Sequence, residues 1–453
     1  MDIPSNLWDK LKALKTEIKK WHQQKRAGDP YKISNLEVEI DREKNCRQFG
    51  LVNGCSWEML AKMKDSLWEL HRKEERSWRQ KSRLKWLQEG DKNTKFFHLA
   101  ASFRRSGNYI DKLIVQGNLI DNPGDIRIAI TEYFVKHFNS SQVVRIKDWS
   151  CNIRSLNMSS SIQLERSFSE NEVWNVINRS DGNKAPGPDG FNMHFFKTYW
   201  SLIKADVMRI FEQFFESGSF DKRLNASFIA LILKCTSALG LNEFRPISLV
   251  GCIYKILAKV LANRLRDVID KVIGPNQFSF IKGRQILDCS LVANEVIDEI
   301  EKKRTGGLIF KVDFEKAYDS VDWSFMDSIM AKMGFGVRWR KWINACVSTA
   351  SLSVLINGTP SRQFRATRGI RQGCPLSPFL FNIVAEALSS LIYSAVSSNL
   401  FKGIKVGSEA VMVSHLQFAD NTIIFCEPDL GQILNMKRVL RCYQVMSGLN
   451  INL

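Results

Sequence analysis

The chain has 453 residues, 44% of them hydrophobic and 11% aromatic, which is enough for roughly two or three domains with sizeable cores. Its 65 lysines and arginines outnumber 47 aspartates and glutamates, and the net charge of +18 favours a polyanionic partner. Its 10 cysteines lack a C-x-x-C pair, and neither a secretory signal nor an apolar run of transmembrane length is predicted, so an intracellular protein without a zinc site is expected.

The first quarter of the chain is predicted to be helical and basic. Residues 1–110 hold 24 lysines and arginines against 15 aspartates and glutamates. In the segment 71–86 cations alternate with tryptophans, and the candidate nucleic-acid-binding residues there are Arg76, Arg79 and Arg83. A solvated amphipathic helix explains the pattern equally well. Both interpretations hold together if the tryptophans pack inward while the cations face outward.

The next stretch predicts a linker followed by a mixed domain. Residues 107–160 are rich in Gly, Asn and Ser, and the run ending at Ile162 is the best linker candidate. Beyond it the pattern alternates between helical and extended periods, which indicates an α+β chain. Ser377 is expected to cap a helix that has Pro378 at its first position. The helices are expected at Glu172–Ile177, Met193–Phe215, Ile253–Ile273, Trp323–Met333 and Phe379–Ile392, and strands at Phe228–Leu233 and Leu308–Val312.

Two carboxylates occur where strands are predicted to end. Asp313 follows the apolar run Leu308–Val312, and Asp420 lies in a predicted hairpin between two apolar runs, with Asn421 beside it in the turn. A fold that brings such carboxylates together provides a site for divalent metals in phosphoryl chemistry. The alternative for Asp313 alone is a helix N-cap after the strand.

The order of six uncommon segments is the strongest signal, although each alone is weak. They are Lys184–Gly190, Phe244–Leu249, Gln277–Arg284, the block around Asp313, Gly369–Pro378 and Phe418–Asn421. Together they closely resemble the reverse transcriptase of non-LTR retrotransposons, the LINE-type elements of plants in particular. The segment Lys81–His98 is also similar to the one that precedes the polymerase in plant elements.

This resemblance implies a right-hand polymerase fold with fingers and palm. The expected division is a basic helical N-terminal extension and linker over 1–160, fingers over 161–305 and palm over 306–453. The chain is expected to end before a thumb and to be a fragment of a degenerate element.

The resemblance also implies RNA-directed DNA polymerase activity. The implied partners are an RNA template, a DNA primer and a dNTP, with two Mg²⁺ ions, or Mn²⁺, at the active site. Asp313 and Asp420 match the catalytic metal ligands. Asn421 replaces the second hairpin aspartate, so it is a third ligand without charge. No membrane partner is expected, and the sequence does not choose between nucleus and cytoplasm or name a protein partner.

Further site residues follow from the same resemblance. Tyr318 matches an aromatic gate against a ribose 2′-hydroxyl; the alternative is an aromatic that supports the palm. Arg284 is a template candidate, and it shares with Arg245 and Lys255 the alternative of a solvated surface. Arg371 is equally compatible with a structural ion pair, and Asp319 and Asp322 are expected to be structural. The candidate nucleotide-binding residues are Phe314, Tyr318, Gln372, Gly373, Arg245 and Lys255.

Two hypotheses remain open for the function. The first is a reverse transcriptase whose activity Asn421 and the missing thumb weaken, and the second is a catalytically silent RNA-binding remnant. An RNA-templated RNA polymerase is disfavoured by the aromatic gate at Tyr318.

Overall fold

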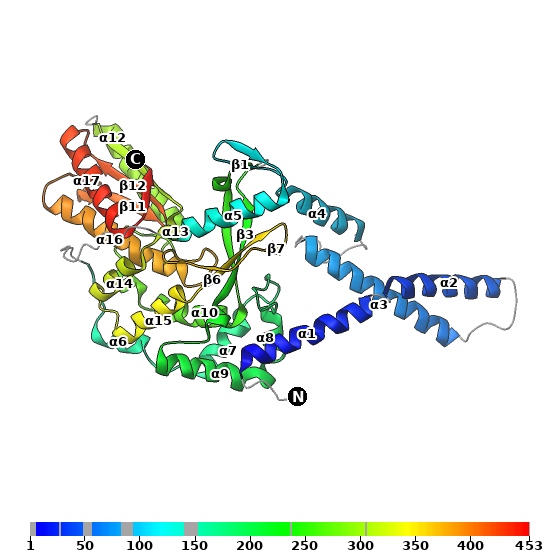
Figure 1. Ribbon diagram of the computed structural model, residues 1–453. Coiled ribbons are helices and arrows are strands. Elements are labelled where there is room, and N and C mark those ends of the chain that lie inside the picture. The colour runs from blue at the N-terminus through cyan, green and yellow to red at the C-terminus, as the bar shows by residue number, and fades with distance from the viewer. Residues whose placement is uncertain are drawn as a thin grey trace. The chain divides into compact units, whose positions relative to one another are not determined.

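A computed structural model describes residues 6–26, 29–48, 57–82, 94–139, 153–235, 238–303 and 306–452 (Figure 1). Its residues fall into two compact units. The first comprises Met1–Asp111 with Leu233–Ala238, and the second comprises Lys112–Ile232 with Leu239–Leu453.

The first unit is helical, as its sequence predicts. Helix α3 packs against both α2 and α4 and buries Leu60, while α4 buries Phe97. The side chain of Asn6 accepts a hydrogen bond from the backbone N–H of Asp9 and so caps the start of α1. The helices are α1 (Leu7–Arg26), α2 (Asp29–Gln48), α3 (Trp57–Ser82) and α4 (Thr94–Gly107).

The predicted linker contains regular structure. Strands β1 (Leu113–Val115) and β2 (Asn118–Ile120) form a hairpin, and α5 (Pro123–Phe138) follows, capped by Asn122. The serine-rich run near its end is helix α6 (Met158–Leu164), which corrects the linker prediction. Serine content suggested a linker, but the side chain of Asn157 caps this helix and Leu164 is buried.

Two long helices of the prediction are interrupted. The stretch from Met193 divides into α8 (Met193–Thr198) and α9 (Trp200–Ser217), because Tyr199 leaves the helical conformation. The next divides into α10 (Cys252–Arg266) and α11 (Ile269–Val272), joined by a tight turn. Around them lie α7 (Glu170–Arg179) and the short 3₁₀ helices η1 (Lys222–Asn225) and η2 (Leu241–Glu243).

One sheet of the second unit has the order β4-β3-β6-β7 among the described residues, and β8 pairs with β6. Strands β3 and β6 are parallel, and their register places Ala226 opposite Ser351. Helices α14 (Trp323–Lys332) and α15 (Val337–Ser348) precede β6 in the chain. The strands are β3 (Ala226–Leu233), β4 (Phe244–Val250), β6 (Ser351–Ile356), β7 (Thr359–Pro360) and β8 (Phe364–Arg365).

The other sheet has the order β11-β12-β5-β13 in the described part of the chain. All of its pairs are antiparallel. Helix α12 (Ile286–Lys303) contacts β11, while α16 (Ser377–Ser397) packs against α17 (Leu430–Ser447) (Figure 1). The strands are β5 (Leu308–Glu315), β11 (His415–Phe418), β12 (Asn421–Cys426) and β13 (Asn450–Asn452), and β9 (Ile404–Val406) forms a separate hairpin with β10 (Val411–Val413).

Helix α16 is the apolar core helix of this unit. Its length and composition would also suit a membrane span, contrary to the expectation that no apolar run of that length occurs, but 78% of its most apolar stretch is buried inside the protein. It begins at Ser377, with Leu376 as the N-cap and no side-chain capping bond, so the predicted Ser377 cap is wrong. Pro378 lies in the first turn, where a missing N–H costs no hydrogen bond.

Candidate active site

Strand β5 presents Asp313 on an open face of its sheet. Val312 and Phe314 are buried, whereas Asp313 between them is exposed, as the alternation of a strand requires. Phe314 is 5% exposed, and its ring contacts Tyr443 of α17 edge-on. The side chain of Phe314 therefore belongs to the core, and the expected nucleotide contact of this residue stays a prediction.

The second carboxylate lies in a tight hairpin loop. Phe418 pairs with Asn421, so the two loop residues are Ala419 and Asp420. Ala419 has a φ of +55° and Asp420 does not lie at positive φ, which fits a type II′ turn. The sequence placed the turn one residue later. Asn421 is instead the first residue of β12.

The pairing of β5 with β12 brings the two motifs together. Thr422 lies opposite Val312, and both are buried. Asn421, one residue before Thr422, and Asp313, one residue after Val312, are both exposed and lie on the opposite face of the sheet. Burial raises the pKa of the half-buried Asp420, and the charge of Asp313 raises it further. The negative charge of Asp313 on β5 therefore acts on the carboxyl group of Asp420 in the hairpin loop.

Tyr318 lies near Asp420. It lies on the short helix α13 (Ala317–Ser320), which follows β5, and its ring stacks on Phe381 of α16 at 4.8 Å between centroids. Burial, with a contribution from the charge of Asp420, raises the pKa of the Tyr318 hydroxyl to about 12. The phenol is thus held rigidly and stays protonated at neutral pH.

The Gly369–Gly373 loop packs against α13 and β4 with little space. The N–H of Ile370 donates to the backbone carbonyl of Tyr318 at 2.7 Å. The N–H of Ser248 donates to the backbone carbonyl of Gln372, also at 2.7 Å. Gly373 has a φ of +97°, and an added Cβ would lie 2.9 Å from the Ser248 carbonyl oxygen. Backbone contacts therefore fix the position of Gln372.

Helix α5 supports this site, which sequence reasoning missed. Asp319 is 1% exposed; its carboxylate lies 3.6 Å from His137 Nε2 and accepts a 3.5 Å bond from Gln372. The guanidinium of Arg368 donates to the carbonyl of His137. The apolar spacing of α5, with Ile126, Ile130, Phe134 and Phe138 buried, was the available signal.

Burial raises the pKa of Asp319, and the nearby imidazole of His137 opposes that shift. Asp322 caps α14 by accepting a 2.8 Å bond from the N–H of Phe325. The prediction that Asp319 and Asp322 are structural is therefore confirmed.

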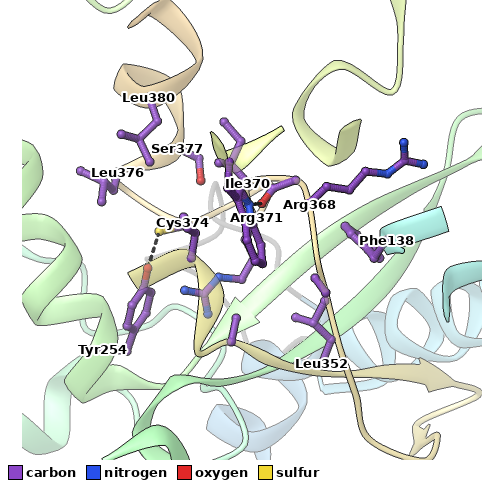
Figure 2. A pocket seen from close by; sticks show the side chains of 15 residues that line it. Phe138, Tyr254, Leu352, Arg368, Ile370, Arg371, Cys374, Leu376, Ser377 and Leu380 are labelled. Carbon is purple, nitrogen blue, oxygen red and sulfur yellow. Dashed lines mark hydrogen bonds between the residues drawn. The ribbon is translucent and has the colours of Figure 1, made fainter. Parts of the chain in front are cut away.

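Arg371 is buried, and no ion pair of its guanidinium occurs among the described residues. Figure 2 shows its side chain near Tyr254 and Cys374. Its guanidinium donates to Ser227 Oγ at 2.9 Å and to the Cys346 carbonyl at 3.0 Å. It also lies 4.1 Å from the ring centroid of Tyr254, whose hydroxyl contacts the Cys374 thiol. One side chain therefore joins the start of β3, the end of α15 and α10.

The candidate cations of the 161–305 region fall into two kinds. Arg245 is exposed on β4, and Lys255 is half-buried on α10. Burial lowers the pKa of the neighbouring Lys259, and the nearby cations, Lys255 first, lower it further. Asp189 of the Lys184–Gly190 motif accepts a bond from the N–H of Cys252 and so caps α10.

Arg284 differs from these cations, because its guanidinium donates to the backbone carbonyls of Gly274 and Gln277. These bonds give Arg284 a structural role, and its expected template contact stays a prediction.

Two of the three N-terminal candidates, Arg76 and Arg79, lie on helix α3. Arg76 is exposed, the side chain of Arg79 is outside the described set, and Arg83 lies outside the described residues altogether. Trp78 contacts the ring of His98 on α4 at 4.2 Å, and Lys81 lies over its face at 4.1 Å. An indole that packs while a cation covers it agrees with the combined interpretation.

The ligand atoms at the hairpin suit a hard divalent cation. Asp313 and Asp420 offer carboxylate oxygens and Asn421 an amide oxygen, which Mg²⁺ and Mn²⁺ accept. The mutual repulsion of the two carboxylates is relieved by a bound cation. Within the described ranges no three His, Cys, Asp or Glu side chains gather as a metal site, so the set comprises two carboxylates and an amide.

Comparisons with known proteins find related sequences. Residues 232–453 match the profile of the family described as reverse transcriptase (RNA-dependent DNA polymerase). The chain is 23% identical over 388 residues to the "Transposon TX1 uncharacterized 149 kDa protein" of Xenopus laevis, covering 85% of this chain and 29% of that protein. It is 25% identical over 298 residues to a "Retrovirus-related Pol polyprotein from type-2 retrotransposable element R2DM" of Drosophila melanogaster, covering 64% and 27%.

A shorter stretch of 71 residues is 42% identical to an uncharacterized mitochondrial protein of Arabidopsis thaliana, covering 16% of this chain and 58% of that protein. The chain spans 29% and 27% of the Xenopus and Drosophila relatives.

Proposed function

Because this chain contains a reverse transcriptase domain related to those of non-LTR retrotransposons, we propose that it copies RNA into DNA. The proposed substrates are an RNA template, a DNA primer with a free 3′-hydroxyl and a dNTP. The proposed division is fingers over 161–305 and palm over 306–453. The observation that carries the proposal is the antiparallel pairing of β5 with β12, which couples Asp313 to Asp420.

In this proposal the hairpin face holds two Mg²⁺ ions, or Mn²⁺, through Asp313, Asp420 and the amide oxygen of Asn421. When bound, these ions lower the pKa of the primer hydroxyl and neutralise charge on the triphosphate. The chain itself orients the ligands. The pleat of β5 presents Asp313, and the two-residue loop presents Asp420 beside it.

Tyr318 and Gln372 are proposed to select and orient the nucleotide. Tyr318 is held by stacking on Phe381 next to Asp420, where a rigid ring excludes a ribose 2′-hydroxyl by contact. Gln372 projects from a loop fixed by Ser248 and Gly373. Arg245 and Lys255 are proposed contacts for the triphosphate or template.

The first unit is proposed to bind the RNA backbone. Helix α3 exposes Arg72 and Arg76, and Arg72 lies over the Trp68 ring at 5.4 Å. Such a cationic surface provides affinity that does not depend on sequence and that falls with salt. An intracellular location, in nucleus or cytoplasm and without a membrane partner, completes the proposal. A plant source is proposed on the 42% identity to the Arabidopsis protein.

The second candidate function is RNA binding without catalysis. Asn421 favours it, because the hairpin face then carries two carboxylates and one neutral ligand, which weakens binding of Mg²⁺.

The test is primer extension by the full chain on an RNA template over a range of Mg²⁺ concentrations. We expect extension by the wild type, a larger product yield for Asn421→Asp with the greatest gain at low Mg²⁺, and none for Asp313→Asn. If Asn421→Asp gives no gain while Asp313→Asn abolishes extension, the amide is an adequate ligand. If no variant extends the primer and the wild type still binds RNA, the polymerase proposal fails and the binding function stands.

A further inference from the structure

The backbone of the hairpin loop is held by a side chain from a distant segment. Gln277 is 1% exposed, and its carboxamide faces Ala419, the residue just before Asp420. Its Oε1 accepts a hydrogen bond from the N–H of Ala419 at 3.0 Å. Its Nε2 donates to the carbonyl of Ala419 at 3.4 Å. One amide therefore binds both polar groups of a single residue, and that residue has a φ of +55°.

This pairing extends the ladder of β11 beyond its end. Gln277 forms a parallel bridge with Gln417, in which the N–H of Gln417 donates to Asn276 at 2.7 Å and Phe278 donates to the Gln417 carbonyl at 2.9 Å. After Phe418 the chain turns towards β12. The side chain of Gln277 takes the place that the next backbone pair would have in a longer ladder.

Gln277 is itself fixed from several directions. The side-chain Oε1 of Gln277 also accepts a 3.1 Å hydrogen bond from the N–H of Ser279. The backbone carbonyl of Gln277 accepts a 2.6 Å hydrogen bond from the guanidinium of Arg284. Ser389 of α16 donates to the side chain of Gln417 at 3.0 Å, which ties the bridge to the core helix. A primary amide has one acceptor and donors in one plane, so neither an apolar side chain nor a carboxylate reproduces both bonds.

We propose that Gln277 is a positioning residue for the metal face, and this inference rests on the function proposed above. Its carboxamide stabilises the left-handed conformation of Ala419 and thereby sets the direction in which Asp420 leaves the loop. Without it, an L-residue at positive φ relaxes, and Asp420 no longer keeps a fixed place beside Asp313. Residues that orient metal ligands typically contribute about 10- to 100-fold to metal affinity.

The test uses the full chain with ¹³C-methyl-labelled alanine, whose Ala419 signal is assigned by its loss in Ala419→Gly. Gln277→Met removes both bonds with little change in shape. Asn225→Leu is the matched control, since Asn225 is a buried amide at the end of η1 that donates to the Cys346 carbonyl of α15 at 3.0 Å. We expect Gln277→Met to shift or broaden the Ala419 signal, and Asn225→Leu to leave it unchanged.

Mn²⁺ titration, followed by paramagnetic broadening of the neighbouring methyl signals, gives the second readout. We expect about tenfold weaker Mn²⁺ binding in Gln277→Met. In the double variant with Ala419→Gly we expect partial recovery, because glycine adopts positive φ without strain. An unchanged Ala419 signal in Gln277→Met, or an equal loss of affinity in Asn225→Leu, would overturn the inference. Asp313→Asn tests the metal site separately: if it leaves Mn²⁺ binding unchanged, the proposed function fails, while the Ala419 signal still decides the role of Gln277.

Discussion

Glu386 offers a quantitative test of the core behind the hairpin. It lies on α16, is 5% exposed, and has its pKa raised to about 7 by burial. A backbone hydrogen bond from Gly274 and the charges of Arg154 and Arg284 oppose the shift without cancelling it. The predicted perturbation is Glu386→Gln, which keeps the shape and removes the ionisable group.

The size and sign of the effect follow from proton linkage. The ordinary pKa of the group is 4.5, so in the folded chain it keeps its proton up to a pH near 7. The folded state binds more protons than the unfolded state between these values, and stability therefore falls as pH rises from about 4.5 to 7. At about 1.4 kcal/mol per pKa unit, the ionised carboxylate costs about 3 kcal/mol above pH 7. Glu386→Gln avoids this cost, so its advantage grows with pH and vanishes near pH 4.5.

The assay is thermal unfolding of wild type and variant at pH 5 and pH 8. At about 2 °C per kcal/mol, the unfolding temperature of the variant should be about 6 °C above that of the wild type at pH 8. At pH 5 the two unfolding temperatures should nearly coincide. Glu301→Gln, on the exposed face of α12, is the matched control and should show no such dependence. A variant less stable than wild type at pH 8 would refute the reasoning, because it would mean that Glu386 is ionised and stabilised by Arg154 and Arg284.

Three further outcomes are expected. Tyr318→Val should raise ribonucleotide incorporation relative to dNTP incorporation in primer extension, and an unchanged ratio would assign Tyr318 to palm support. Arg371→Met should lower the free energy of unfolding by about 3 kcal/mol in urea, because buried carbonyls lose a charged donor, and a loss below about 1 kcal/mol would contradict the cross-link. Changing Arg72, Arg76 and Lys81 together to Gln should flatten the slope of log RNA affinity against log salt concentration. The expected change is about 0.7 for each RNA phosphate that these cations neutralise in the wild type. A slope equal to that of the wild type would mean that α3 is a solvated helix without RNA contact.

The sequence predicted the two strands of the site but not the register between them. The apolar run Leu308–Val312 was enough to predict the strand that carries Asp313, and the flanking apolar runs predicted the hairpin around Asp420, although β5 continues to Glu315. The turn was placed one residue late, since Asp and Asn favour turns and Ala does not. The observed turn depends on the bonds from Gln277, which is 142 residues away from Ala419 in the chain. No local propensity contains that information.

The support of the site by α5 was missed for a related reason. The 107–160 stretch was judged by its Gly, Asn and Ser content, and the buried stripe of α5 within it was not weighed. What makes α5 part of the site is tertiary: His137 faces Asp319, and Arg368 bonds the His137 carbonyl. Arg284 and Phe314 were assigned from motif position alone. Whether such a side chain points to solvent or to the core is decided by packing against segments far along the chain.

The register also changes what Asn421 means. As the first residue of β12, and not part of the loop, it shares the open face with Asp313 by the pleat of the sheet. A carboxylate there would add a third negative charge beside Asp313 and Asp420, where the charge of Asp313 already raises the cost of ionising Asp420. The amide therefore relieves repulsion in the metal-free chain and at the same time removes charge that would attract a cation. These two effects have opposite signs, so a substitution that strengthens metal binding is expected to weaken the metal-free fold at this face.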